Sequence, residues 1–230
     1  MNTRSPQNEG RQTPPNRREA GRASDDSPPG VSASLTRAAT SIRGIVSDVD
    51  GVMTDGSIWY GEDGSEWKRF HVRDGLAIKH WIAAGNCFGV ITARGGSSVR
   101  RRMAELGVGE LVENSSDKRQ DFHTMIHRWG LTAAQTAFVG DDLADALSMI
   151  DSGLGVAPED ACDDVLGLAD VTLAVRGGEG VLRSLIETLM RASGTWPTPI
   201  AATGDPTGSP PTATNPTATN PPATTPKRVD

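Results

Sequence analysis

Two aspartates, Asp48 and Asp50, stand one residue apart shortly after the apolar pair Ile45-Val46. The apolar pair is typical of a buried parallel strand, and Gly51 indicates a turn where the strand ends. Because residues i and i+2 share one face of an extended chain, both carboxylates can point to the same place. Two close carboxylates repel each other unless they share a cation or a proton. The pair predicts a Mg²⁺ site with a carboxylate nucleophile, and an acidic turn without chemistry is the alternative.

Three further polar groups each follow a predicted strand. Thr92 comes directly after an apolar run, Lys118 after a short strand and a loop, and the pair Asp141-Asp142 shortly after another apolar run. In an open parallel sheet the ligand crevice lies outside the carboxyl ends of the strands, so these residues should meet the two aspartates there. Each group alone is typical of an ordinary turn or helix start. Found together in this order, they indicate one shared site.

These residue types suit phosphoryl transfer. The transferred group is anionic, so a carboxylate that attacks it needs its own charge cancelled. A Mg²⁺ ion does this, and Asp48 and Asp141 are natural ligands for it. Either Asp142 or Asp145 would complete the set, directly or through water. Lys118 would add a fixed positive charge.

Two other side chains complete the predicted chemistry. The hydroxyl of Thr92 can donate a hydrogen bond to a phosphate oxygen. Asp50, beside the nucleophile, can protonate the departing alkoxide and then activate water against an aspartyl-phosphate. The residues therefore predict a Mg²⁺-dependent phosphatase.

Strands and helices are expected to alternate along the chain. This alternation predicts right-handed βαβ units and an α/β fold, in which a parallel sheet is covered by helices on both faces. Asp74 is predicted to cap the first helix. The predicted strands are 45–46, 87–91, 110–112, 137–139, 154–156 and 171–175, and the predicted helices are 75–84, 97 or 98 to 106, 118–129, 143–150, 160–168 and 181–192.

A β-hairpin interrupts this alternation. Residues 57–60 and 66–70 flank a turn that carries glycine and aspartate, which is the pattern of an antiparallel hairpin. Trp59, Tyr60 and Trp67 would form an exposed apolar surface on a lone hairpin, which favours packing against another subunit. Packing on their own domain is the alternative.

The two ends of the 230-residue chain differ in composition from its middle. Residues 1–40 are rich in Arg, Pro, Ser, Asn and Gln, and residues 195–230 are mostly Pro, Thr, Ala, Asn and Gly. Such segments bury too little apolar surface to offset the entropy of ordering, so both are predicted to be disordered tails. Residues 41–194 would then form one globular domain.

Charge and hydropathy exclude several kinds of partner. The formal net charge of -6 gives no support to nucleic-acid binding. The chain shows no signal-peptide pattern and no apolar stretch approaching the ~20 residues that a membrane span needs. Cys87 and Cys162 do not make a disulfide framework. We therefore expect a cytoplasmic protein without a membrane partner.

The order of the motifs resembles that of the haloacid dehalogenase superfamily. Its first motif is matched by residues 48–54 (Asp-Val-Asp-Gly-Val-Met-Thr), its second by Thr92, its third by Lys118 and its fourth by residues 140–142. The resemblance implies a three-layer Rossmann-like fold. It also implies Asp48 as the nucleophile, and Asp50 as a general acid/base whose backbone carbonyl binds Mg²⁺. The intervals between the motifs leave no room for a cap domain.

Within the superfamily, the chain is similar to the phosphatases that hydrolyse 3-deoxy-D-manno-octulosonate 8-phosphate, a reaction of lipopolysaccharide biosynthesis. The hairpin and residues 54–56, 70–75, 115–118, 140–143 and 177–183 carry this similarity, which spans residues 42–194. It implies a phosphorylated sugar-acid substrate. It also implies a homotetramer in which the hairpins pack together and neighbouring subunits help to close each active site.

The chain departs from this family at two positions. Ala93 stands where a glycine is common, and His71 where many members have asparagine. Arg73 and Arg94 are candidates for the substrate carboxylate, because arginine binds carboxylates through two hydrogen bonds, and His71 could also touch substrate. Two alternatives stay open: a phosphatase for a related ulosonate phosphate, such as a sialic-acid or nonulosonate 9-phosphate, and a non-catalytic oligomerising module with the same fold.

Overall fold

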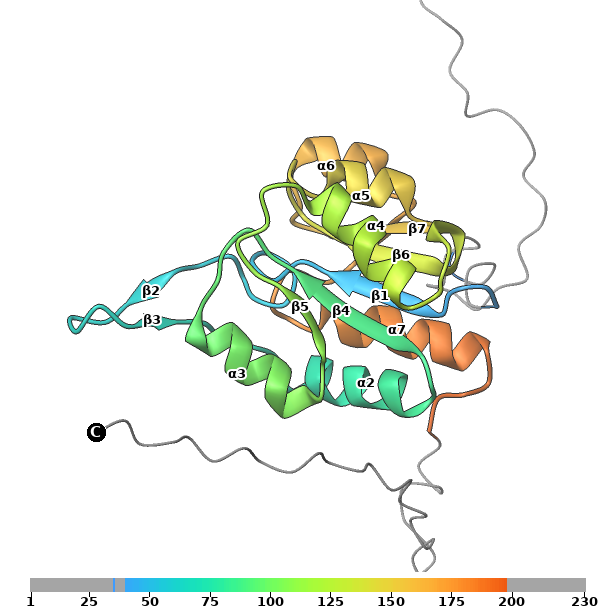
Figure 1. Cartoon of the computed structure of the whole chain (residues 1–230), viewed down its shortest axis with the longest axis horizontal. Coiled ribbons are helices and arrows are strands. Elements are labelled where there is room, and N and C mark those ends of the chain that lie inside the picture. The colour runs from blue at the N-terminus through green and yellow to red at the C-terminus, as the bar shows by residue number, and fades with distance from the viewer. Residues whose placement is uncertain (1–34, 36–39, 198–230) are drawn as a thin grey trace, which may run out of the picture. The chain divides into compact units, whose positions relative to one another are not determined.

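The computed structural model describes residue 35 and residues 40–197, and it is built on one six-stranded parallel sheet (Figure 1). The strand order is β5-β4-β1-β6-β7-β8, so β1 lies inside the sheet, between β4 and β6. The predicted tails, 1–40 and 195–230, lie outside the described residues except at residues 35, 40 and 195–197. The strands are β1 (Gly44–Ser47), β4 (Cys87–Ile91), β5 (Glu110–Val112), β6 (Thr136–Val139), β7 (Leu154–Pro158) and β8 (Val171–Leu173).

Helices cover both faces of this sheet (Figure 1). The predicted α/β fold is therefore confirmed. In the described part of the chain, no helix combines the length and apolar character needed to cross a membrane. On one face lie α2 (Val72–Ala83), α3 (Ser97–Leu106) and α7 (Val181–Ala192), and on the other lie α4 (Lys118–Arg128), α5 (Ala146–Asp151) and α6 (Asp163–Leu168), with the short 3-10 helix η1 (Ala133–Gln135) before β6.

The sheet separates two apolar cores. All four residues of β1 are buried, as expected for a strand covered on both faces. Because side chains alternate along a strand, Ile45 belongs to the core under α2, α3 and α7, whereas Val46 belongs to the core under α4, α5 and α6. Both cores therefore hold β1 in place, and the residues that follow β1 start from a fixed point.

The hairpin of β2 (Trp59–Tyr60) and β3 (Glu66–Trp67) projects away from the sheet (Figure 1). Trp59 and Trp67 lie directly opposite each other, and with Tyr60 they are 62%, 64% and 70% exposed. The alternative that these aromatic side chains pack on their own domain is therefore wrong for the described chain. Only the hairpin and α2 separate β1 from β4, and only α3 and β5 separate β4 from α4, so the predicted absence of a cap domain is confirmed for both intervals.

Several predicted boundaries shift by a few residues. The hairpin strands are shorter than predicted, and α5 and α6 each begin three residues later. In place of a first turn of α5, the Asp142 carboxylate accepts a hydrogen bond from the Leu143 amide, and the Asp145 amide donates to the Asp142 carbonyl. Asp residues favour such local bonds, which compete with helix formation.

The prediction that Asp74 caps its own helix, α2, is wrong. His71 occupies the N-cap of α2, and Asp74 lies within that helix with only 2% of its surface exposed. Its carboxylate accepts a 2.6 Å hydrogen bond from the backbone N–H of Arg183, in the first turn of α7. Asp74 therefore caps a helix that lies 109 residues further along the chain. Burial raises the pKa of its carboxyl to about 6, against the opposing effects of the Arg183 hydrogen bond and the nearby His71.

We predict that two substitutions of Asp74 differ in stability but share one pH dependence, because neither new side chain can ionise. Asp74→Ala removes the cap and should lower the free energy of unfolding by about 1 kcal/mol. Asp74→Asn keeps an acceptor for the Arg183 N–H but cannot ionise. Because the folded-state pKa of Asp74 is raised, its neutral form stabilises the fold below pH 4, and that contribution is lost as the pH rises through about 6.

Urea unfolding at pH 4, 5.5 and 7 measures this difference. The stability of Asp74→Asn relative to wild type should increase from pH 4 to pH 7. A difference that stays constant over this range would contradict the assignment.

Candidate active site

Asp48 directly follows β1 and lies inside the carboxyl edge of the sheet. Its backbone N–H donates to the Val139 carbonyl at the end of β6, at 2.9 Å, and the residue is 7% exposed. Gly51 then turns the chain with a φ of 89°, in the left-handed region. A Cβ at this position would collide with the carboxylate of Asp141, so only glycine allows the two loops to approach so closely.

Three carboxylates converge at this edge. Asp48, Asp141 and Asp145 each offer an oxygen, and these oxygens lie within 4.8 Å of one another. Oδ1 of Asp48 and Oδ1 of Asp141 are buried and have no hydrogen-bond partner within the described residues. Buried, unpaired carboxylate oxygens are costly, and they are the ligands that a hard divalent cation prefers. The residues present therefore fit a divalent metal ion.

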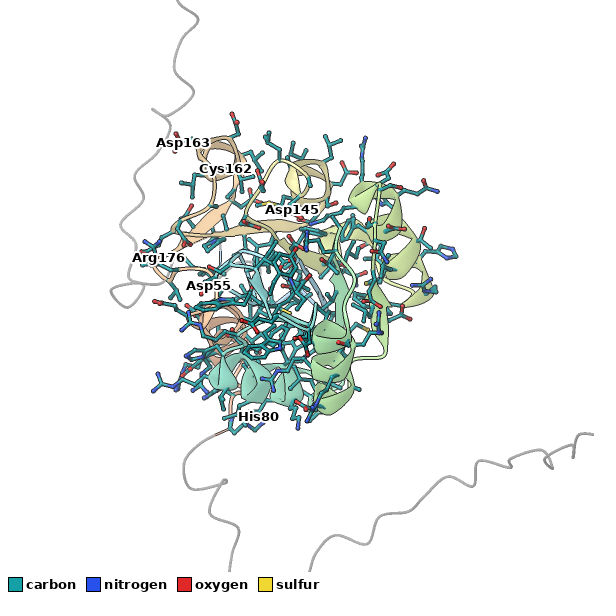
Figure 2. All side chains as sticks on the ribbon, turned by 90° about the vertical axis from the view of Figure 1, so that its left-hand side faces the viewer. Asp55, His80, Asp145, Cys162, Asp163 and Arg176 are labelled. Atoms are coloured by element: carbon teal, nitrogen blue, oxygen red, sulfur yellow. The ribbon has the colours of Figure 1, made fainter. Side chains whose placement is uncertain are left out.

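Asp145, and not Asp142, belongs to this group. Asp145 is fully buried, and its Oδ2 accepts hydrogen bonds from the backbone N–H groups of Asp141 and Asp142, at 3.2 and 3.3 Å. Asp142 is exposed, and its carboxylate bonds to the next residue instead. Of the two residues that the sequence left open, Asp145 lies among the oxygens that could hold a metal ion. Figure 2 faces this edge of the molecule and labels Asp145.

Lys118 connects two of the three carboxylates. It begins α4, is 6% exposed, and places its Nζ 2.9 Å from Asp48 Oδ2 and 2.7 Å from Asp145 Oδ1. Burial disfavours the charged amine, but the attraction of Asp48 and Asp145 outweighs it and raises the pKa of Lys118. The amine therefore stays protonated at the centre of the site.

The carboxylates are destabilised in their ionised form. Burial, and then repulsion from Asp145, raises the pKa of Asp48 to about 7, even though Lys118 opposes the change. Burial, and then repulsion from Asp48 and Asp145, raises the pKa of Asp141 to about 7. One ammonium group cannot balance three carboxylates, so the site is short of positive charge.

Thr92 and Arg94 complete the wall of a cavity of about 180 Å³. Thr92 is almost fully buried, and its Oγ1 accepts a 3.2 Å hydrogen bond from the Arg94 N–H. The Arg94 side chain is 43% exposed and pairs with Glu66 of the hairpin at 3.1 Å. The cavity also contains Asp48, Asp50, Lys118, Asp141, Asp142 and Asp145, so the structure brings the predicted catalytic and metal-binding residues together.

Arg73 and His71 lie apart from this group. Neither lines the cavity, and Arg73 is exposed in the first turn of α2. The carbonyl of His71 accepts a 3.3 Å hydrogen bond from Arg102. Of the three predicted substrate-binding residues, Arg94 alone lines the cavity of the single described chain.

Sequence reasoning missed Lys68, which contacts the Asp50 carboxylate through its amine. Lys68 comes just after β3, and the hairpin folds it back against the residues that follow β1. The spacing of Lys68 and Asp50 in the sequence does not predict their contact, because the contact depends on how the hairpin returns to the sheet.

A second cavity of about 350 Å³ adjoins the first and shares Ala93, Lys118 and Ala144 with it. Ser115 and Ser116 form part of its polar wall, and Leu143 and Leu147 form part of its apolar wall. A molecule whose phosphate lies near Lys118 therefore has room for a larger polar group beside it.

Comparison with known proteins gives close relatives. No protein-family model matches the chain. The chain is similar to 3-deoxy-D-manno-octulosonate 8-phosphate phosphatase of Escherichia coli K12, with 36% identity over 164 residues, which is 71% of this chain and 87% of the relative. The enzyme of the same name from Haemophilus influenzae is 35% identical over 153 residues, 66% of this chain and 85% of the relative.

Solved structures show a similarity to the same kind of phosphatase. The phosphatase of that name from Yersinia pestis superposes with a TM-score of 0.70 at 34% identity, covering 72% of this chain and 89% of that one. The Moraxella catarrhalis enzyme, solved in complex with magnesium ion, phosphate ion and a KDO molecule, superposes with a TM-score of 0.67 at 30% identity, covering 69% and 91%.

We predict that Mg²⁺ binding releases protons. Because the pKa values of Asp48 and Asp141 are raised to about 7, both carboxyls are partly protonated near neutral pH, and a cation must displace those protons. The affinity for Mg²⁺ should therefore rise from pH 6 to pH 8 and then level off. The metal-free protein should lose stability as the pH rises from 4 towards 7, since the folded state holds protons that the unfolded state has released.

Isothermal titration with Mg²⁺ at pH 6, 7 and 8, in buffers of different ionisation enthalpy, counts the released protons. Asp163→Asn, an exposed carboxylate on α6, serves as the control and should behave as wild type. An affinity for Mg²⁺ that does not depend on pH would contradict the prediction.

Proposed function

Since the chain belongs to the family of 3-deoxy-D-manno-octulosonate 8-phosphate phosphatases, within the haloacid dehalogenase superfamily, we propose that it hydrolyses this sugar-acid phosphate. The products are 3-deoxy-D-manno-octulosonate and inorganic phosphate. The observation that carries the proposal is the buried group of Asp48, Asp141 and Asp145 beside Lys118, at the carboxyl edge of the sheet. A group of this charge is suited to an anionic phosphate only when a cation is bound.

Asp48 is the proposed nucleophile. Its carboxylate attacks the phosphorus, the bond from phosphorus to the sugar oxygen breaks, and an aspartyl-phosphate forms. Lys118, 2.9 Å from Asp48, and the hydroxyl of Thr92 stabilise the negative charge on the transferred group. Asp48, Asp141 and Asp145, with the backbone carbonyl of Asp50, would hold Mg²⁺, which when bound cancels the repulsion between the nucleophile and the phosphate.

Asp50 is the proposed general acid and base. Its protonated carboxyl gives a proton to the departing alkoxide, and the resulting carboxylate then takes a proton from the water that hydrolyses the aspartyl-phosphate. Asp50 lines the same cavity as Asp48 and Lys118, which supports this role. After both steps the two aspartates return to their starting protonation states.

Arg94 is the proposed ligand of the sugar-acid carboxylate. It lies at the wall of the phosphate cavity, and its side chain is partly exposed. A guanidinium group can bind a carboxylate through two parallel hydrogen bonds. Arg73 and His71 stay predictions as substrate ligands, because they lie outside the cavity of the single chain.

The exposed aromatic hairpin supports a homotetramer, in which neighbouring subunits cover one another's hairpins. Trp59 and Trp67, which face each other across the hairpin, and Tyr60 on its other face are exposed, and this is an apolar liability on a free monomer. A neighbouring subunit would also bring other residues near the open side of each site. Packing of this kind would serve in place of the cap domain that the fold lacks.

A cytoplasmic location is part of the proposal. Cys87 and Cys162 are both free thiols, as is usual where the compartment keeps thiols reduced. The substrate, a phosphorylated sugar acid, carries several negative charges and does not cross a bilayer unaided.

We expect phosphate release from 3-deoxy-D-manno-octulosonate 8-phosphate to exceed that from nonulosonate 9-phosphates and from neutral sugar phosphates, and to require Mg²⁺. A phosphate-release screen with the full chain and with the chain lacking residues 198–230 measures this order. Faster phosphate release from a nine-carbon acid phosphate would mean that this compound is the substrate in place of the octulosonate phosphate. Inertness across the whole panel with Mg²⁺ would favour a non-catalytic oligomerising module.

Asp48→Asn should lower the rate by at least about a thousandfold and should leave no acid-stable phosphoryl group on the protein after quenching. Asp163→Asn is the matched control, an exposed carboxylate on the far side of α6 from the sheet, and should keep the wild-type rate. A full rate with Asp48→Asn would exclude the proposed nucleophile.

The hairpin carries a separate prediction about assembly. The triple variant Trp59→Ser, Tyr60→Ser and Trp67→Ser should convert a tetramer of the 24.2 kDa chain to smaller species, as measured by light scattering after gel filtration. Leu76→Ser with Ile150→Ser removes two comparably exposed apolar side chains from α2 and α5 and should leave the mass unchanged. A monomeric wild-type protein would contradict the tetramer.

A further inference from the structure

Four side chains of alternating charge connect the hairpin to the active site. Arg94 Nη2 lies 3.1 Å from Glu66 Oε2, Glu66 Oε1 lies 3.3 Å from Lys68 Nζ, and Lys68 Nζ contacts Asp50 Oδ1. Arg94 and Asp50 follow β4 and β1, whereas Glu66 and Lys68 belong to β3 and the residues just after it. Through the hairpin, the series therefore joins two residues that line the cavity.

The Lys68 pair differs from an ordinary surface ion pair. The Lys68 side chain has no exposed surface, and Asp50 and Glu66 retain only 20% and 24%. Lysine is almost never buried this fully unless its amine is paired. An amine held between two carboxylates has little freedom, so its position fixes that of its partners.

Asp50 has few other restraints. Within the described residues its hydrogen bonds involve Oδ1 alone, from Lys68 and, at 3.5 Å, from the Thr54 hydroxyl. The Thr54 hydroxyl also donates to the Val49 carbonyl at 3.3 Å, so its bond to Asp50 is weak. Lys68 is therefore the main contact that orients the carboxyl, and Oδ2 is left for exchange of a proton with the substrate.

We propose that Lys68 is a positioning residue for Asp50, and that Glu66 holds both Lys68 and Arg94 in place. The proposal rests on the proposed function, because it assigns Asp50 the proton transfers and Arg94 the substrate carboxylate. Through these contacts the hairpin sets the orientation of the general acid and of the carboxylate-binding group together. Neither Lys68 nor Glu66 needs to touch the reacting atoms.

The proposal separates substrates by their leaving groups. A sugar alkoxide is strongly basic and leaves only with a proton, which the general acid must deliver. A nitrophenolate is weakly basic and leaves without one. Losing the orientation of Asp50 should therefore slow the formation of the aspartyl-phosphate, which kcat/KM reports, much more with a sugar phosphate than with 4-nitrophenyl phosphate. The later hydrolysis of the aspartyl-phosphate, in which Asp50 acts as the base, is common to both substrates and does not enter kcat/KM. A general defect in folding or metal binding would slow both reactions equally.

The test compares these two substrates in Lys68→Met and Lys68→Arg, with the full chain and saturating Mg²⁺. Because general acid–base catalysis is worth about a hundredfold or more, Lys68→Met should lower kcat/KM for the sugar phosphate by about ten- to a hundredfold. Its kcat/KM for 4-nitrophenyl phosphate should fall less than about threefold, because that leaving group needs no proton. Lys68→Arg should recover part of the loss.

Arg69→Met is the matched control. Arg69 is the next residue in the chain, and its ion pair with Asp55 is largely exposed, with 61% of the Arg69 side chain accessible. An exposed pair of this kind contributes little. Arg69→Met should leave both activities at the wild-type level.

Glu66→Gln tests the shared carboxylate. It should lower kcat/KM for the sugar-acid phosphate through both Arg94 and Lys68, while kcat/KM for 4-nitrophenyl phosphate stays nearly unchanged. Equal losses of kcat/KM on both substrates in Lys68→Met, or no loss on either, would overturn the proposal. If the octulosonate phosphate is not hydrolysed at all, the proposed substrate is wrong. The role of Lys68 is then decided with another sugar phosphate that the protein hydrolyses, by comparing the loss on that substrate with the loss on 4-nitrophenyl phosphate.

Discussion

The repulsion between three buried carboxylates is the interaction on which the rest of the site depends. Asp48, Asp141 and Asp145 hold oxygens within 4.8 Å of one another, and Lys118 offsets only part of their charge. Each like-charge pair at such a distance costs about 3–4 kcal/mol at an effective dielectric constant of 20. The fold tolerates this cost because the cation that relieves it also prepares the site for an anionic phosphate. The arrangement of the three carboxylates therefore favours the binding of a metal ion.

Such a site needs loops that approach closely and cannot relax. The hydrogen-bonded pairing of β1 with β6 places Asp48 beside the loop that carries Asp141, and the two apolar cores prevent either strand from moving away. A side chain at Gly51 would strike the carboxylate of Asp141, and a side chain at Gly177 would strike the backbone of Gly51. Gly177 packs against the carbonyl of Gly51, which ties the loop before α7 to the nucleophile turn. The carboxylates are therefore held by rigid elements that bear no charge themselves.

Much of this could be predicted from the sequence, because apolar runs mark the strands and the parallel topology brings their carboxyl ends together. Asp48, Thr92, Lys118 and Asp141 were predicted in this way and line one cavity. Where the prediction failed or stayed open, the deciding contact is tertiary. Asp145 is distinguished from Asp142 only by the local turn that buries it, and the partner of Asp74 lies 109 residues away. The contact of Lys68 with Asp50 depends on the path of the hairpin.

That path also explains how a fold without a cap can control its chemistry. A two-stranded hairpin is marginally stable alone, so its orientation must come from contacts outside it. Glu66, beside its turn, and Lys68, just after β3, tie it to Arg94 and Asp50. Trp59 and Trp67, opposite each other on the hairpin, are 62% and 64% exposed in the described part of the chain. In the proposed tetramer, a subunit that packs on these side chains would therefore act, through two short strands, on residues that line the cavity.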